Sequence, residues 1–233
     1  MYTVDERGKE VLFMKNKVIK RETLKSQVYN YLKDGIILGH INPGDRLIEE
    51  KISTELQVSR SPIREAIRML EKDGLLYVNS SGGVTVVKPT IEDFRSLYEC
   101  RVEMESLATY YAAKRRSLEE LEKMRSHLLE MDNITPSKNL TKVNDENSNF
   151  HETIVEASRN PFLIKMTGQL RGVNSFYRKA ILDNYPLHFK DALVDHQKIF
   201  QAIMNQDKEA ARLHMRQHIE NDYKLFMKIV EEG

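Results

Sequence analysis

One short segment of the chain places hydroxyl and guanidinium groups where a helix is expected to begin. The segment reads Val58-Ser59-Arg60-Ser61-Pro62-Ile63-Arg64-Glu65-Ala66. Ser61 is suited to cap the helix and Pro62 to take its first position, where a missing N–H costs nothing. Helix N-termini and serine hydroxyls bind phosphate, and an arginine can grip guanine O6 and N7 with two hydrogen bonds. We therefore predict DNA contacts from Ser59, Arg60, Ser61 and Arg64, whose arginines lie four residues apart on one helical face.

The elements around this segment predict a winged helix-turn-helix. Apolar spacing predicts helices over residues 23–38 and about 49–56, and the helix that begins at Ser61 is expected to end at Asp73-Gly74. Two β-prone segments, residues 76–78 and 84–87, flank a glycine-rich turn over 79–83. The tip of this hairpin, with Gly82, can lie along the DNA backbone or the minor groove.

A lone Ser-Arg-Ser sequence is more often an ordinary capped surface helix with solvated arginines. Here the turn, the proline, the apolar spacing and the hairpin agree, and together they favour DNA binding. In a helix-turn-helix the N-terminal end of the second helix enters the major groove. The serines and arginines of this segment therefore lie where they could contact phosphates and base edges.

The rest of the chain is predicted to be helical. Residues 91–115 follow a long 3.6-residue period, and Ser117-Leu118-Glu119-Glu120 is a capping box for the next helix. Further helices are expected over residues 140–157, 161–184, 187–205 and 207–231, with no strand pattern past residue 88. We expect a mainly α protein with a tail at residues 1–20, a winged helix-turn-helix at 21–88 and an all-α bundle at 89–233.

Composition excludes several classes of protein. The 36 Lys and Arg residues balance the 35 Asp and Glu residues, so net charge gives no signal for nucleic acid. The single cysteine, Cys100, excludes an intramolecular disulfide framework and fits a reducing compartment. No apolar run approaches a membrane span or a signal-peptide core, so we expect a cytoplasmic protein without a membrane partner.

Three of the seven histidines fall on three different predicted helices. His151 follows Asn147 by four residues and shares its helical face, while His196 and His218 lie on two later helices. Three imidazoles that converge inside a bundle can hold a divalent first-row metal. Spacing alone favours the alternative of three unrelated polar or core histidines, because a sequence does not prove convergence.

Residues 24–88 resemble the DNA-binding domain of the GntR superfamily of bacterial regulators. The match is carried by Ile41-Asn42-Pro43-Gly44-Asp45-Arg46-Leu47, by the segment from Val58 to Ala66, and by Leu70-Glu71-Lys72-Asp73-Gly74-Leu75. Two residues depart from the family pattern: Gln57, where glycine is frequent, and Glu50, where some members carry a DNA-contacting arginine. The resemblance implies DNA-facing roles for Ser59, Arg60, Ser61 and Arg64, with Arg46 close to the DNA.

Residues 91–231 resemble the FCD ligand-binding domain of the FadR branch of that superfamily. The match is carried by Phe150-His151 and by residues 157–161, 196–203 and 211–219. The resemblance implies a divalent metal, such as zinc, nickel or manganese, held by one Asp and three His. The corresponding residues are Asn147, His151, His196 and His218. A neutral amide oxygen at position 147 can still ligate, but weaker binding or a different metal preference is expected.

The same resemblance gives Arg101 a role in the cavity, where it would meet a carboxylate effector through a bidentate bond. The structural alternative is a salt bridge from Arg101 to Glu105, four residues further along the helix.

These expectations combine into a transcriptional regulator, a repressor, that binds a pseudo-palindromic double-stranded operator as a homodimer and is controlled by an organic-acid effector. We expect no enzymatic activity. The rival interpretation as a metal-dependent helical-bundle enzyme lacks carboxylates paired at a suitable spacing and leaves residues 24–88 unexplained. A second rival, an effector-independent dimeric DNA-binding protein, would have no ligand cavity.

Overall fold

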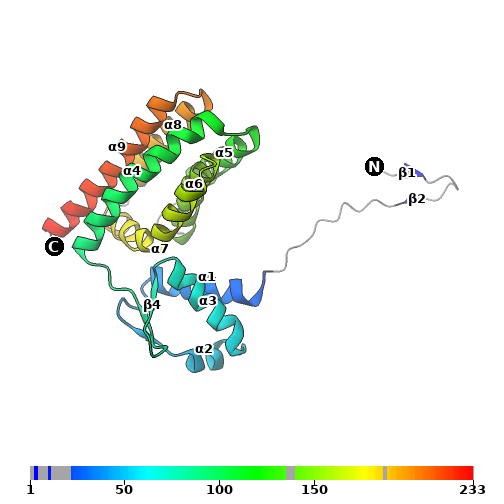
Figure 1. Cartoon of the computed structure of the whole chain (residues 1–233), viewed down its shortest axis with the longest axis vertical. Coiled ribbons are helices and arrows are strands. Elements are labelled where there is room, and N and C mark those ends of the chain that lie inside the picture. Colours follow the sequence, from blue (N-terminus) through cyan, green and yellow to red (C-terminus); the bar gives the residue numbers. More distant parts are fainter. Residues whose placement is uncertain (1–2, 5–9, 12–21, 135–139, 186–187, 233) are drawn as a thin grey trace.

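The computed structural model places a small winged helix-turn-helix below a bundle of long helices (Figure 1). The structure describes residues 3–4, 10–11, 22–134, 140–185 and 188–232. The fold is mainly α, as expected. In the N-terminal tail the two-residue strands β1 (Thr3–Val4) and β2 (Glu10–Val11) pair antiparallel, which no sequence pattern predicted.

The winged helix-turn-helix consists of three helices and a three-stranded sheet. The helices are α1 (Leu24–Ile37), α2 (Glu49–Leu56) and α3 (Arg60–Lys72). The strands β3 (Arg46–Leu47), β4 (Leu76–Val78) and β5 (Val84–Val86) pair antiparallel in the order β3-β5-β4. The apolar face of α3 is buried against α1 because Ile63, Ala66, Ile67 and Leu70 recur at helical spacing. Strand β3 was not predicted, since two residues carry no readable period.

Helix α3 begins earlier than the proline suggests. Ser59 is its N-cap with an extended backbone, Arg60 is the first helical residue, and Pro62 is the third. The prediction of Ser61 as N-cap and Pro62 as the first helical residue was therefore wrong. Proline is tolerated throughout the first turn, because the N–H groups there have no acceptor within the helix, and so it does not fix the boundary.

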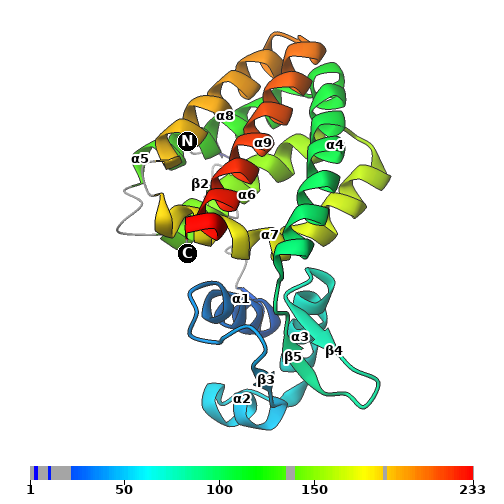
Figure 2. The same cartoon turned by 90° about the vertical axis from the view of Figure 1, so that its left-hand side faces the viewer.

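Six helices form the part of the bundle that the structure describes. They are α4 (Ile91–Arg115), α5 (Leu118–Asn133), α6 (Leu140–Ala157), α7 (Pro161–Asn184), α8 (His188–Met204) and α9 (Lys208–Glu232). The predicted capping box of Ser117 and Glu120 is present at the start of α5, and Thr90 forms a second one with Asp93 before α4. Helices α4 and α9 run side by side along the bundle (Figure 2). None of the helices described is long and apolar enough to cross a membrane.

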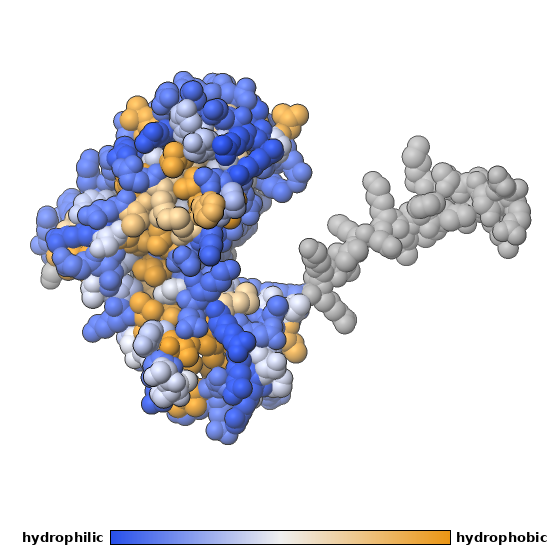
Figure 3. Space-filling view, viewed as in Figure 1, coloured by the Kyte–Doolittle hydropathy of each residue, from blue (hydrophilic) through white to orange (hydrophobic). Residues whose placement is uncertain are grey.

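The two parts meet where α7 rests on the winged helix-turn-helix. Gly172 of α7 lies against the backbone of Asp73, the C-cap of α3, and a Cβ at this glycine would overlap the Asp73 carbonyl oxygen. The Tyr29 hydroxyl donates to Asp73 Oδ2 at 2.6 Å, and Lys33 pairs with Asp145 at 3.0 Å. Apolar surface on the face in view gathers toward this junction (Figure 3). The C-terminal end of α3 is thus in direct contact with the bundle.

Candidate nucleic-acid interface and metal centre

The predicted base-reading residues occupy one exposed end of α3. Ser59, Arg60, Ser61 and Arg64 are all exposed, and two glutamates from the first turn of α2 face the arginines. The Arg60 guanidinium pairs with Glu50 at 3.2 Å, and Arg64 Nε donates to Glu49 Oε2 at 2.8 Å. The two arginines are therefore already oriented by acidic partners in the absence of DNA.

The remaining predicted DNA contacts lie on the sheet. Arg46 is exposed on β3 and pairs in register with Thr85 of β5. Gly82 stands in the hairpin turn with φ 80°, a left-handed conformation that favours glycine. The Asn79 side chain accepts the N–H groups of Ser81 and Gly83 and so stiffens this turn.

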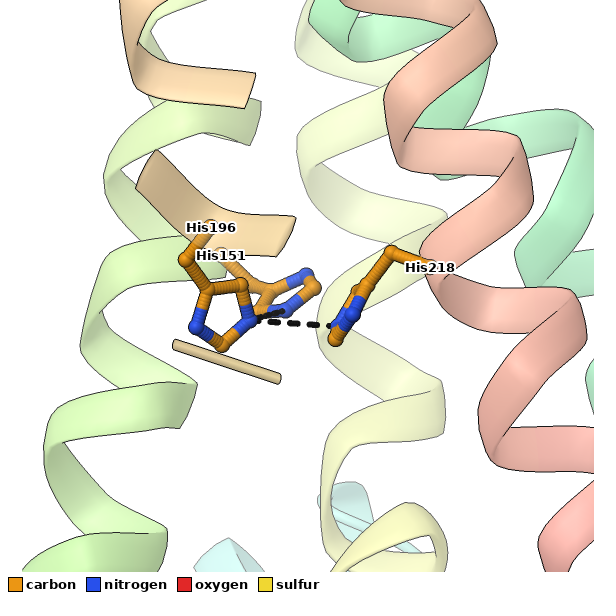
Figure 4. A group of neighbouring side chains, drawn as sticks. All are labelled: His151, His196 and His218. Carbon is orange, nitrogen blue, oxygen red and sulfur yellow. Dashed lines mark hydrogen bonds between the residues drawn. The ribbon is translucent and has the colours of Figure 1, made fainter. Parts of the chain in front are cut away.

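The three predicted histidines converge in the middle of the bundle (Figure 4). His151 of α6, His196 of α8 and His218 of α9 are buried and turn their ring nitrogens toward one another. The Nε2 atoms of His151 and His196 are 3.2 Å apart, and those of His196 and His218 are 3.1 Å apart. Imidazoles bound at about 2.0–2.1 Å to one first-row metal hold neighbouring nitrogens about 3.0–3.4 Å apart, so this spacing fits a shared ion.

Electrostatics keep these imidazoles in the form that binds metal. Burial lowers the pKa of all three, that of His218 to about 3, while the hydrogen bond to Glu105 partly offsets the effect on His151. His151 Nδ1 donates to Glu105 Oε2 at 2.7 Å, which leaves the Nε2 lone pair facing its neighbours. A carboxylate behind a metal-binding imidazole fixes ring and tautomer in this way.

Arg101 forms the salt bridge that the sequence offered as the structural alternative. Its Nε donates to Glu105 Oε1 at 2.6 Å, and its Nη1 donates to Asn174 Oδ1 of α7 at 2.8 Å. Burial would raise the pKa of Glu105, but Arg101 and His151 outweigh it and hold that pKa well below its usual range. Arg101 also lines a small pocket together with Asn147, His151 and Asn174.

Two protein families match this chain, one in each domain. The gntR family of bacterial regulatory proteins matches residues 24–86, and the FCD domain matches residues 96–221, more than half of the chain. The chain belongs to the GntR family. Its N-terminal winged helix-turn-helix is the DNA-binding domain of a transcriptional regulator, and its bundle is an FCD domain.

Relatives of this GntR-family regulator span most of its length. The transcriptional regulator YdhC of Bacillus subtilis is 33% identical over 209 residues, which cover 89% of this chain and 92% of that protein. The Uxu operon transcriptional regulator of Escherichia coli is 30% identical over 210 residues, which cover 82% of this chain and 81% of that protein. The solved structure of E. coli McbR/YncC, 22% identical, shares the fold with a TM-score of 0.75 over 89% of this chain and 99% of that one. These proteins are regulators, and the enzyme interpretation is excluded.

Two polar residues of the regulator's pockets, Arg178 and Asp222, were not predicted from the sequence, whereas Asn147, which lies between them and His151's pocket, was. Asn147 is buried one turn before His151 and borders two pockets, the second of which is lined by Arg178, His196 and Asp222. Arg178 donates to Asp222 Oδ2 at 3.2 Å, whereas its Nε has no partner among the residues that the structure describes. Asp222 stands four residues after His218, a spacing that could have drawn attention to it. No comparable signal marks Arg178.

Proposed function

We propose that this GntR-family regulator represses transcription as a homodimer on a pseudo-palindromic operator, and that an organic acid bound beside a divalent metal in the FCD domain controls operator affinity. The observation that carries the proposal is the convergence of three buried Nε2 atoms in the domain whose α7 contacts the recognition helix. A 26% identical relative, the Gluconate operon transcriptional repressor of Bacillus licheniformis, supports both repression and an organic acid.

For DNA binding, Arg60 and Arg64 read bases while the serines at the start of α3 and Arg46 bind phosphates. The hairpin tip at Gly82 follows the backbone or the minor groove. A single recognition helix reads only a few base pairs, so useful specificity requires two half-sites and therefore two copies of the chain. A protein that sediments as a monomer at micromolar concentration, with and without DNA, would contradict the homodimer.

For the metal, His151, His196 and His218 are the ligands, and Asn147 is a weak fourth ligand or a hydrogen-bond partner of a bound water. The ion is zinc, nickel or manganese. Buried Glu105 accepts from His151 Nδ1 and strengthens that imidazole as a ligand, which offsets in part the charge that an amide at position 147 lacks. Such an ion supplies a Lewis-acidic position that a carboxylate can occupy.

For the effector, Arg101 lies in the pocket beside His151 and can anchor a carboxylate, with Arg178 as a second anchor on the far side of Asn147. A carboxylate that binds Arg101 competes with Glu105 for the guanidinium. Because Arg101 also donates to Asn174 of α7, this competition acts on the helix that carries Gly172. Displacement of α7 would then shift the C-terminal end of α3, which supports control of DNA binding from this pocket.

Metal analysis and thermal denaturation test this proposal. Protein purified without chelator or His-tag is expected to carry about one metal per chain, and His196→Ala to lose it and melt at a lower temperature. His214→Ala is the matched control, since His214 lies on the same bundle outside the histidine cluster. An organic acid that binds only the native state raises the melting temperature. Protein that stays metal-free after incubation with zinc, nickel and manganese, and is unchanged by His196→Ala, would contradict the metal site.

A further inference from the structure

We propose that Glu50 is a specificity-determining residue that accepts a hydrogen bond from the N4 amino group of an operator cytosine, in the base pair that Arg60 reads or in its neighbour. The inference rests on the proposed insertion of α3 into the major groove. It adds to that proposal an acidic reader beside the basic one, contributed by α2 rather than by α3.

The starting observation is a pair of opposite charges held at the exposed junction of α2 and α3. The Glu50 carboxylate lies 3.2 Å from Arg60, with 75% of the Glu50 side chain and 56% of the Arg60 side chain exposed. Arg60 is the one side-chain partner that the structure gives Glu50 among the described residues. An ion pair this exposed contributes little to the stability of the fold. We therefore expect the pair to act in DNA binding, because both side chains are exposed at the proposed DNA face.

The neighbouring pair is built differently. Glu49 is 27% exposed and accepts from Arg64 Nε at 2.8 Å. Glu49 is therefore turned toward the protein and binds Arg64 through Nε. The terminal nitrogens of that guanidinium stay available for the DNA. Glu50 faces outward, so the two adjacent glutamates do different things: Glu49 positions an arginine, and Glu50 is itself presented to the groove.

A carboxylate that faces DNA needs a hydrogen-bond donor on the DNA to offset its repulsion by the phosphates. Phosphates repel it, and each half-site would lose affinity unless the charge met an N–H group. The major-groove edge of cytosine offers the N4 amino group, with which Glu and Asp pair, and guanine offers the O6 and N7 acceptors that suit arginine. A guanidinium and a carboxylate held side by side therefore match the acceptors and the adjacent donor of a G·C base pair.

The test begins by selecting duplexes from a random library with full-length wild-type protein. Each enriched cytosine is then replaced by 2-pyrimidinone, which still pairs with guanine but lacks the amino group. At one position in each half-site this replacement is expected to weaken wild-type binding at least about tenfold, because it removes one hydrogen bond to a charged group. The same replacement should barely affect Glu50→Ala, and Glu50→Gln, which keeps an acceptor oxygen, should respond partially.

Glu65→Ala is the matched control. Glu65 is an exposed acid of α3 that pairs with Lys25 at 3.6 Å, so its removal changes net charge equally without touching Arg60. It should strengthen binding to all duplexes and keep the wild-type response to 2-pyrimidinone. If Glu50→Ala behaves as Glu65→Ala does, Glu50 acts only as a charge and the inference is wrong. A wild-type protein that enriches no sequence would contradict the proposed DNA reading, and the inference with it, before the analogue is used.

Discussion

Arginine–glutamate pairs occur in both domains, and their surroundings give them opposite properties. Arg60–Glu50 and Arg64–Glu49 lie at the surface, whereas Arg101–Glu105 is buried within the FCD domain. Water screens the surface pairs, so each arginine there can contact a DNA base without leaving a buried, unpaired charge behind. Opening the buried pair leaves an uncompensated charge, so only a ligand that brings its own carboxylate can replace Glu105. The same pairing thus leaves the arginines accessible at the proposed DNA face and holds Arg101 in a fixed position at the pocket.

The largest effect is expected from breaking the buried pair. Glu105→Ala leaves Arg101 buried without its carboxylate and removes the acceptor of His151 Nδ1. We expect the free energy of unfolding of the helical domain to fall by about 3–5 kcal/mol, measured by urea denaturation. The control is Glu103→Ala on the same helix, which removes an exposed partner of Arg216 and should cost no more than about 1 kcal/mol. Equal, small losses for both variants would show that burial does not distinguish the pairs.

An intermediate effect is expected at the DNA face. Arg60→Ala and Arg64→Ala should each weaken binding to the selected duplex by about 1–3 kcal/mol and flatten the discrimination between operator variants. A change at a residue that contacts only phosphate should instead weaken all duplexes alike and lower the salt dependence. Fluorescence anisotropy with variant duplexes at several salt concentrations separates the two. Wild-type affinity in both arginine variants would mean that α3 does not read the operator.

How far the sequence predicts this molecule depends on how local each feature is. Helix ends were predicted closely where a cap is encoded within a few residues, as at Ser117, and the start of α3 was misplaced because proline fits several positions of a first turn. The partner of Arg101 at Glu105 was foreseeable from its spacing along one helix. The contact of Arg101 with Asn174 and the meeting of three imidazole rings depend on how separate helices pack, which no local pattern encodes.

A smaller effect is expected from restoring a carboxylate near the histidines. Asn147→Asp adds a negative oxygen on the face of α6 that carries His151, and a charged ligand binds a divalent cation better than an amide does. Zinc affinity, measured by competition with a chelator, should rise about tenfold, the low end for changes around a metal site. Asn144→Asp, one turn further from His151 on the same helix, is the control. Unchanged zinc affinity in Asn147→Asp would place residue 147 outside the site.

The smallest effect on folding is expected from Glu49→Ala at the surface. The variant should unfold within about 1 kcal/mol of wild type, because its pair with Arg64 is partly solvated and gains little over hydration. Its effect should appear in DNA binding instead, since Glu49 orients Arg64 and also repels phosphate. Loss of orientation lowers discrimination between operator variants, while loss of the negative charge raises affinity for all duplexes, most strongly at low salt. Anisotropy at two salt concentrations resolves these opposing contributions. If Glu49→Ala lowered the free energy of unfolding as much as Glu105→Ala does, the contrast between weakly stabilising surface pairs and a strongly stabilising buried pair would be wrong.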